Sequence, residues 1–361
     1  MTAFEEKILD VIQDAFPLEV RPYKVLADLF NEQGSVGAVT EQQVFNAVES
    51  LRTSGIIRRI GGIYDSRRLG FISRLCAGKV SDIEKFAAAV NEIPAITHNY
   101  QRSHEYNVWF TIIAQSEDEI RAVVDKLCAQ TDLHDVHVLS VTKKFKIDTV
   151  MRGADAPVGS RQLSVGKQPV AAFASHVIAR NVVTKQSTEE CHLERRGVAS
   201  KSKDLKNNDR TRIRIACTDI PHTLTPYADW GVSVDELRED IACGYMRRFG
   251  AILRHQQAGF AFNAMVCFAS HVIARSETTK QSILTDNDAG CILANNPHVS
   301  HCYERPAFEG FPYNLYAMMH AQSAEDLDRF IKEAAQSIGN PDYAVLHSVR
   351  ELKKTSFKFF A

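Results

Sequence analysis

The chain has 361 residues, which at about 150 residues per domain suggests two or three domains. Its 43 lysines and arginines almost balance its 44 aspartates and glutamates, so no overall field would draw it to nucleic acid or to anionic lipid. No apolar run approaches the ~18 residues of a membrane helix, no signal-peptide pattern opens the sequence and the eight cysteines form no Cys-x-x-Cys pair, so we expect a cytoplasmic protein without a disulfide frame or a zinc ribbon.

The first 68 residues predict a winged helix-turn-helix. Apolar residues in Phe4–Ala15 recur at helical spacing, and Pro22 begins a second helix. Thr40 with Gln43 forms a capping box for a third helix that extends to about residue 54. Residues 56–64 alternate around an expected Gly61-Gly62 turn, so the wing is predicted to be a hairpin.

Residues 69–152 predict a ferredoxin-like domain of the order β-α-β-β-α-β. Ser81 with Glu84 is expected to cap its first helix, and Ser116 with Glu119 its second. The expected strands are residues 71–79, 96–101, 106–114 and 136–145. The chain is therefore predicted to be of the α+β class.

The sequence then repeats itself. The run Arg58–Ile63 recurs 189 residues later as Arg247–Ile252, and the run His98–Arg102 recurs 203 residues later as His301–Arg305. Because the order is the same in both copies, we expect a tandem duplication. The second half would hold a shortened winged helix-turn-helix at 211–258 and a second ferredoxin-like domain at 259–361.

A second kind of repeat lies at non-equivalent places. Residues 173–187 match residues 268–282 at 12 of 15 positions. The first copy falls in residues 153–210, which are predicted to be a linker, and the second falls inside the second ferredoxin-like domain. We interpret both as late insertions, the second near 270–282.

A winged helix followed by a ferredoxin-like domain resembles the Lrp/AsnC regulators, which makes DNA binding an obvious hypothesis. DNA affinity depends on Lys and Arg that neutralise phosphates. The candidate recognition helix carries Glu41 and Glu49 against Arg52 alone, and its counterpart in the second half carries four acidic residues against Arg238. The charges therefore argue against DNA as a partner.

The repeated motif His-x-Tyr-x-Arg carries the chemistry. On a strand, alternate residues share a face, so His98, Tyr100 and Arg102 are expected to point the same way. His301, Tyr303 and Arg305 repeat this arrangement. Arginine grips carboxylates and histidine exchanges protons near neutral pH, so the motif suits an anionic substrate. The alternative is that the motif merely occupies a solvated sheet face. No dedicated metal site is predicted.

The run Gly244–His255, with Gly259-Phe260 and the run His301–Arg305, resembles the siroheme decarboxylases, which are Lrp-like proteins of haem d1 synthesis and of the siroheme-dependent haem route. Members of that family often work as pairs of related subunits. The chain looks like such a pair fused head to tail. It departs from the family pattern at the insertion and in its shortened second winged helix. Ser66 stands in the first half where His255 stands in the second.

The resemblance implies decarboxylation of the C12 and C18 acetate side chains of siroheme to give didecarboxysiroheme. No added cofactor is implied, because the siroheme iron is part of the substrate. The implied catalytic residues are His301, His255 and Tyr303, and either histidine could instead ligate the iron. The implied substrate-binding residues are Arg58, Arg59, His98, Tyr100, Arg102, Arg247, Arg248 and Arg305.

Two other functions fit the same features. One is a ligand-responsive transcription regulator of the Lrp/AsnC type, and the other is a tetrapyrrole-binding protein without catalysis. The expected partner is siroheme, with neither membrane nor DNA. A homodimer of the fused chain is a further alternative.

Overall fold

The computed structural model describes residues 1–34, 37–147, 205–228, 230–254, 262–269 and 284–360. The chain forms two compact units. The first unit comprises residues 1–70, 150–258 and 358–361, and the second comprises residues 71–149 and 259–357. Each unit thus combines a part of both sequence halves. Both copies of the inserted repeat fall largely outside the described residues. None of the described helices has the length and apolarity needed to cross a membrane.

The first unit contains the two winged-helix parts. Its elements are α1 (Ala3–Asp14), α2 (Pro22–Gln33), α3 (Glu41–Thr53), β1 (Ile57–Tyr64), α8 (Asn207–Ala216), α9 (Val234–Ala242) and β7 (Met246–Leu253). The predicted capping box of α3 is confirmed, because the Thr40 side chain accepts from the Gln43 amide while the Gln43 side chain accepts from the Thr40 amide.

The predicted hairpin at Gly61-Gly62 is wrong. β1 runs straight through both glycines and pairs antiparallel with β7 of the other half, with Gly61 directly opposite Gly250. A Cβ on Gly250 would lie 2.7 Å from the Ile12 carbonyl oxygen, and a Cβ on Gly61 would lie 3.0 Å from that of Ala216. Glycine is therefore needed because helix ends approach the strands closely, not because the chain turns.

The second helix-turn-helix is reduced. α8 begins at Asn207, inside residues 153–210 that were expected to be linker. Pro226-Tyr227 matches the Pro22-Tyr23 pair that begins α2, yet the described residues between α8 and α9 contain no helix. The counterpart of α2 is therefore missing from the described part of this half.

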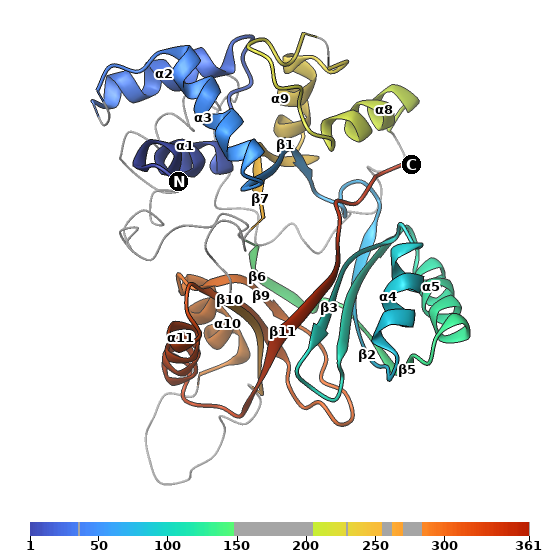
Figure 1. Ribbon diagram of the computed structural model, residues 1–361. Coiled ribbons are helices and arrows are strands. Elements are labelled where there is room, and N and C mark those ends of the chain that lie inside the picture. The colour runs from blue at the N-terminus through green and yellow to red at the C-terminus, as the bar shows by residue number, and fades with distance from the viewer. Residues whose placement is uncertain (35–36, 148–204, 229, 255–261, 270–283, 361) are drawn as a thin grey trace. The chain divides into compact units, whose positions relative to one another are not determined.

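The second unit is built on a nine-stranded sheet of order β5-β2-β4-β3-β11-β8-β10-β9-β6 (Figure 1). The first half contributes β2 (Ile72–Lys79), α4 (Ile83–Asn91), β3 (Ile96–Arg102), β4 (Val108–Ala114), α5 (Glu117–Gln130), β5 (His134–Leu139) and β6 (Lys143–Ile147). The second half contributes β8 (Phe262–Phe268), α10 (Asp286–Asn295), β9 (Val299–Glu304), β10 (Leu315–Ala321), α11 (Ala324–Ser337) and β11 (Tyr343–Lys354). Each half shows the predicted βαββαβ order.

The last strand of each half joins the two halves. The start of β11 pairs with β8 of its own half, and its end pairs with β3 of the first half. The single strand predicted at 136–145 is wrong: β5 ends at Leu139, and β6 begins at Lys143 and pairs with β9. The chain divides there because its two parts bond to different halves.

One predicted cap also differs. Asp82, rather than Ser81, caps α4 and accepts from the Lys85 amide. Ser81 instead donates its own backbone amide to the Asp132 carboxylate at 2.6 Å. The cap of α5 by Ser116 is confirmed.

Three apolar clusters fill the second unit. One lies beneath α4 and α5 and one beneath α10 and α11. The third, around Trp109, Phe311, Tyr316 and Leu346, comes from the opposite sheet face of both halves. We call that face, which lies opposite α4, α5, α10 and α11, the inner face.

Candidate active site on the inner sheet face

The two His-x-Tyr-x-Arg motifs lie on β3 and β9. Between their members, Asn99 is buried opposite Phe110 of the helix-side core, and Cys302 contacts the Gly290 carbonyl of α10. The histidines, tyrosines and arginines therefore point to the inner face. Arg102 lies 4.9 Å above the Tyr100 ring, and Arg305 lies 5.1 Å above the Tyr303 ring.

Both arginines of the motif are buried rather than solvated, with 4% of Arg102 and 8% of Arg305 exposed. The Arg102 Nη1 donates to the Leu346 carbonyl at 3.2 Å, and the Arg305 Nη1 donates to the Leu139 carbonyl at 2.9 Å. Each guanidinium thus reaches a strand of the other half, Arg102 reaching β11 and Arg305 the end of β5. Burial lowers the pKa of Arg102 to about 10 and lowers that of Arg305.

Neither guanidinium forms an ion pair with any carboxylate that the structure describes. The Nε atoms of Arg102 and Arg305 are buried without a hydrogen-bond partner. A buried cation normally has a carboxylate partner. Both arginines therefore have an unused Nε donor and a positive charge that no described carboxylate balances.

The histidines are oriented by neighbouring hydroxyl groups. The His98 Nδ1 lies 2.9 Å from the Thr97 Oγ1, and the His301 Nδ1 lies 2.9 Å from the Ser300 Oγ. Ser300 also lies 2.9 Å from the Nε2 of a further histidine, His320. The sequence reasoning missed both Ser300 and His320, although alignment of the two halves places His320 opposite Ile113.

The other predicted site residues lie elsewhere. Arg58 and Arg59 are on β1, and Arg247 and Arg248 are on β7, all in the first unit. The Arg59 Nη2 donates to the Gly62 carbonyl at 3.3 Å, and burial lowers the pKa of Arg59. His255 lies outside the described residues. Both His-x-Tyr-x-Arg motifs therefore lie in the second unit, whereas the four arginines of β1 and β7 lie in the first unit.

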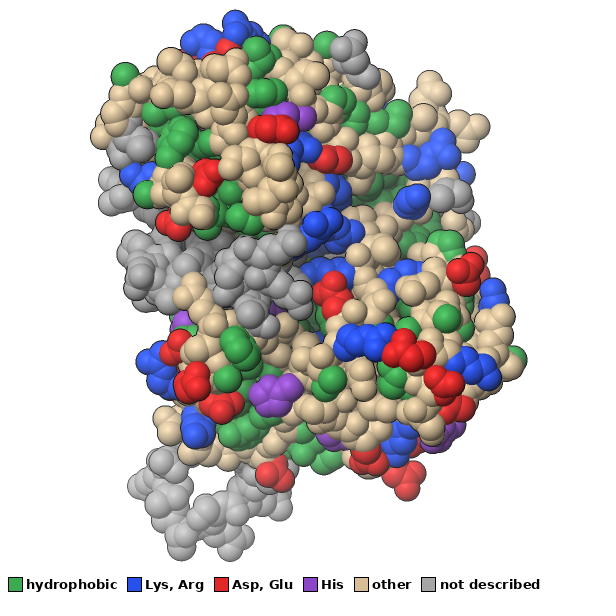
Figure 2. Space-filling view, in the orientation of Figure 1, with side chains coloured by type: hydrophobic (Ala, Val, Ile, Leu, Met, Phe, Trp, Pro, Cys, Tyr) green, Lys and Arg blue, Asp and Glu red, His purple; other side chains and the backbone are tan. Residues whose placement is uncertain are grey.

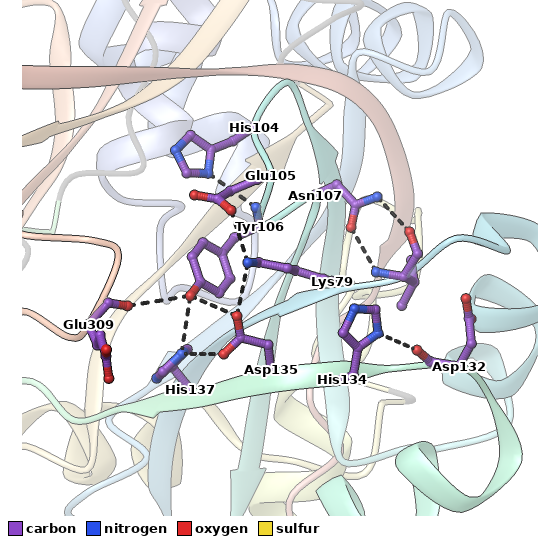
Figure 3. A network of polar contacts seen from close by, with 11 residues as sticks. Lys79, His104, Glu105, Tyr106, Asn107, Asp132, His134, Asp135, His137 and Glu309 are labelled. Atoms are coloured by element: carbon purple, nitrogen blue, oxygen red, sulfur yellow. Dashed lines mark hydrogen bonds and ion pairs between the residues drawn. The ribbon is translucent and has the colours of Figure 1, made fainter.

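A second polar network lies in the same unit as the motifs (Figure 3). The Tyr106 hydroxyl donates to Asp135 at 3.0 Å, and the Lys79 Nζ lies 2.9 Å from Asp135 and 2.9 Å from Glu105. The Lys79 ammonium is the main reason why the pKa of Asp135 falls to about 2. His137, 3.0 Å from Asp135, stacks on Phe308 of the other half. This network braces the β3–β4 turn against the second half.

Comparison with known proteins agrees with this architecture. The family model described as an AsnC-like ligand binding domain matches residues 68–146 and 257–353, and the siroheme decarboxylase NirDL-like HTH domain matches residues 5–58. A siroheme decarboxylase of Hydrogenobacter thermophilus is 30% identical, with 99% of this chain and 95% of that protein covered. The siroheme decarboxylase alpha subunit of Desulfovibrio desulfuricans is 41% identical over 41% of this chain and 82% of its own length.

Solved structures agree as well. The crystal structure of the siroheme decarboxylase NirDL has a TM-score of 0.60 at 26% identity and covers 99% of this chain and 94% of its own. The siroheme decarboxylase NirDL in complex with an iron-uroporphyrin III analogue has a TM-score of 0.59 at 25% identity. That match covers 98% of this chain and 94% of the NirDL chain. The predicted fold class, a duplicated winged helix and ferredoxin-like domain, is confirmed. The chain belongs to the siroheme decarboxylase family.

Proposed function

We propose that this chain is a siroheme decarboxylase that removes the carboxyl groups of the C12 and C18 acetate side chains and releases didecarboxysiroheme for haem or haem d1 synthesis. One observation carries the proposal. Arg102 and Arg305 are buried on the inner face without a described carboxylate partner, and each motif places a histidine on the same strand. The family match over nearly the whole chain supports the same activity.

The buried arginines suit a substrate that is rich in carboxylates. An uncompensated buried charge costs several kcal/mol, and a peripheral carboxylate of siroheme would supply the missing partner. Arginine binds such groups in bidentate fashion. The carbonyl oxygens of Leu139 and Leu346 satisfy only part of the donor capacity of the two guanidiniums.

Each decarboxylation replaces a carboxylate by a proton. The bond between the acetate methylene and the carboxylate breaks, carbon dioxide leaves, and the electron pair stays on the methylene carbon, where the conjugated ring delocalises it. A proton from the imidazolium of His301 then gives the methyl group. We assign to the Tyr303 phenol a hydrogen bond to the reacting arm. The balance is redox-neutral, so we expect no added cofactor.

The direct test is anaerobic incubation with siroheme, followed by mass spectrometry for loss of two carboxyl groups. Recovery of unchanged siroheme from correctly folded protein would contradict the proposal. Product that has lost both groups would also exclude a role as a non-catalytic tetrapyrrole-binding protein.

The buried arginines are tested by binding. Arg305→Met removes charge-assisted hydrogen bonds worth about 1.5–3 kcal/mol, so the Kd for iron-uroporphyrin III should rise by roughly 10- to 100-fold. Arg305→Lys, which keeps the charge, should lose less affinity. Arg329→Met, on the exposed face of α11, is the matched control and should bind normally. Equal affinity of all three variants would remove Arg305 from substrate binding.

We do not propose a transcription regulator. Arg52 of the candidate recognition helix is held by Asp219 of the second half, with Nη1–Oδ2 at 2.6 Å and Nη2–Oδ1 at 3.0 Å. His222 stacks on Phe45 of the same helix with ring centroids 4.1 Å apart. Acidic side chains also lie among the basic ones on the face of the first unit that Figure 2 shows. We expect no salt-dependent DNA binding.

We place the reaction in the cytoplasm and keep a homodimer of the fused chain as an alternative to the monomer.

A further inference from the structure

One hydroxyl group joins two imidazoles on the inner face of the second half. The Ser300 Oγ lies 2.9 Å from the His301 Nδ1, 2.9 Å from the His320 Nε2 and 3.3 Å from the Met318 carbonyl oxygen. Ser300 is buried. His320 is fixed on β10, where its backbone amide donates to the His298 carbonyl at 3.2 Å.

Proton counting couples the two rings. A serine hydroxyl can donate one hydrogen bond and accept two. If Ser300 donates to His301, then the Nε2 of His320 must carry the proton that it donates to Ser300. If Ser300 donates to His320 or to the Met318 carbonyl, then the Nδ1 of His301 must carry a proton. A His320 ring that accepts the Ser300 proton at its Nε2 therefore requires a proton on the Nδ1 of His301, so the protonation states of the two rings are coupled.

The first half cannot form this arrangement. Its histidine, His98, faces the hydroxyl of Thr97 as His301 faces that of Ser300. β4 and β10 have the same length and the same order of buried and half-buried positions, and the position that holds His320 in β10 holds Ile113 in β4. An isoleucine can neither donate nor accept a proton. The two motifs are therefore chemically different although their own residues match.

We propose that His320 is a positioning residue which sets the tautomer of His301 through Ser300, and that the second half is consequently the half that transfers the proton. This inference rests on the proposed function. A hydrogen bond to one ring nitrogen decides which nitrogen carries the proton and which way the ring points. When His320 accepts from Ser300, the Nδ1 of His301 keeps its proton, so the proton that the His301 imidazolium gives up leaves from Nε2 toward the substrate. The motif of the first half then serves binding.

The kinetic test replaces His320 by the isoleucine that the first half has at the equivalent position. His320→Ile should lower kcat for siroheme decarboxylation by at least about tenfold with KM nearly unchanged, because loss of a hydrogen-bond partner that orients a functional histidine typically costs about 10- to 100-fold. Ser300→Ala should do the same. Ser300→Thr keeps a hydroxyl at this position, as Thr97 does in the first half, and should retain most of the wild-type rate that Ser300→Ala loses. The control Ile113→Val should keep the wild-type rate. A wild-type kcat in His320→Ile would overturn the proposal.

A spectroscopic test does not depend on catalysis. The ¹⁵N signals of the His301 ring, assigned with His301→Gln, report its tautomer in the unliganded full chain. They should shift in His320→Ile and in Ser300→Ala but not in Ile113→Val, at equal thermal unfolding midpoints. Unchanged His301 signals would overturn the positioning role. A wild-type chain that leaves siroheme unchanged but shows these shifts would instead overturn the proposed function alone.

Discussion

At the scale of single residues, buried charges differ in how fully they are compensated. Asp240, 1% exposed, accepts from the Tyr64 hydroxyl at 2.7 Å and from two nitrogens of Arg212 at 2.7 and 3.2 Å. Burial and this carboxylate both raise the pKa of Tyr64. Arg102 and Arg305 have no such carboxylate among the described residues. Asp240 therefore has the hydrogen-bond partners expected of a structural charge, whereas the two arginines are candidates for a functional one, as we propose above.

Removal of the Asp240 carboxylate should destabilise the first unit strongly. Asp240→Ala leaves Arg212 without its main partner and should lower the free energy of unfolding by about 3–5 kcal/mol. Asp235, on the same helix, has an 89% exposed side chain and pairs with Arg238, so Asp235→Ala should cost less than about 1 kcal/mol. Urea unfolding followed by circular dichroism compares the two variants. Similar losses would show that Asp240 acts as an ordinary surface acid.

At the scale of elements, local signals are readable from sequence and long-range partners are not. The capping box at Thr40 and the side-chain cap at Ser116 each involve residues three apart, and both caps are confirmed. The Gly61-Gly62 pair was misinterpreted because its partner strand lies 189 residues away. The strand at 136–145 was misjudged because its two parts pair with β2 and β9.

The site shows the same limit. Alternation on a strand placed each His-x-Tyr-x-Arg motif on one face, which requires only neighbouring residues. The contact between Ser300 and His320 depends on how β9 and β10 align, and their register shifts between Met318 and Met319. No local pattern in the sequence encodes that shift, so the contact of His320 with Ser300 could not be predicted, although the aligned halves already differ at that position.

The end of α1 lies so close to Gly250 on β7 that a substitution there tests how tightly the helix packs on the strand. In Gly250→Ala, the new Cβ would meet the Ile12 and Gln13 carbonyl oxygens at 2.7 and 2.9 Å, so strands or helix must move at a cost of about 1–3 kcal/mol. Gly37 has nothing within 4 Å of its Cβ position, so Gly37→Ala should change stability by less than about 1 kcal/mol. Thermal unfolding measures both variants, and equal midpoints would contradict the packing argument.

At the scale of the whole molecule, the two halves are held together by strands that cross between them. β1 pairs with β7, the end of β11 pairs with β3, and β6 pairs with β9. Arg102 and Arg305 add hydrogen bonds in both directions. Either half alone would expose several strand edges, which favours aggregation. The two halves of the chain thus complete each other's sheets.

A split chain should therefore reassemble. Residues 1–150 and 205–361, produced together with a tag on the first piece only, should co-purify in equal amounts and bind iron-uroporphyrin III, because every cross-half strand pair is retained. Either piece produced alone should aggregate. A first piece that ends at Thr142 lacks β6 and its ladder with β9, so it should retain less of the second piece in the same tag pull-down. Halves that purify separately as stable monomers would show that each completes its own fold, and that the crossing strands join two domains instead of completing them.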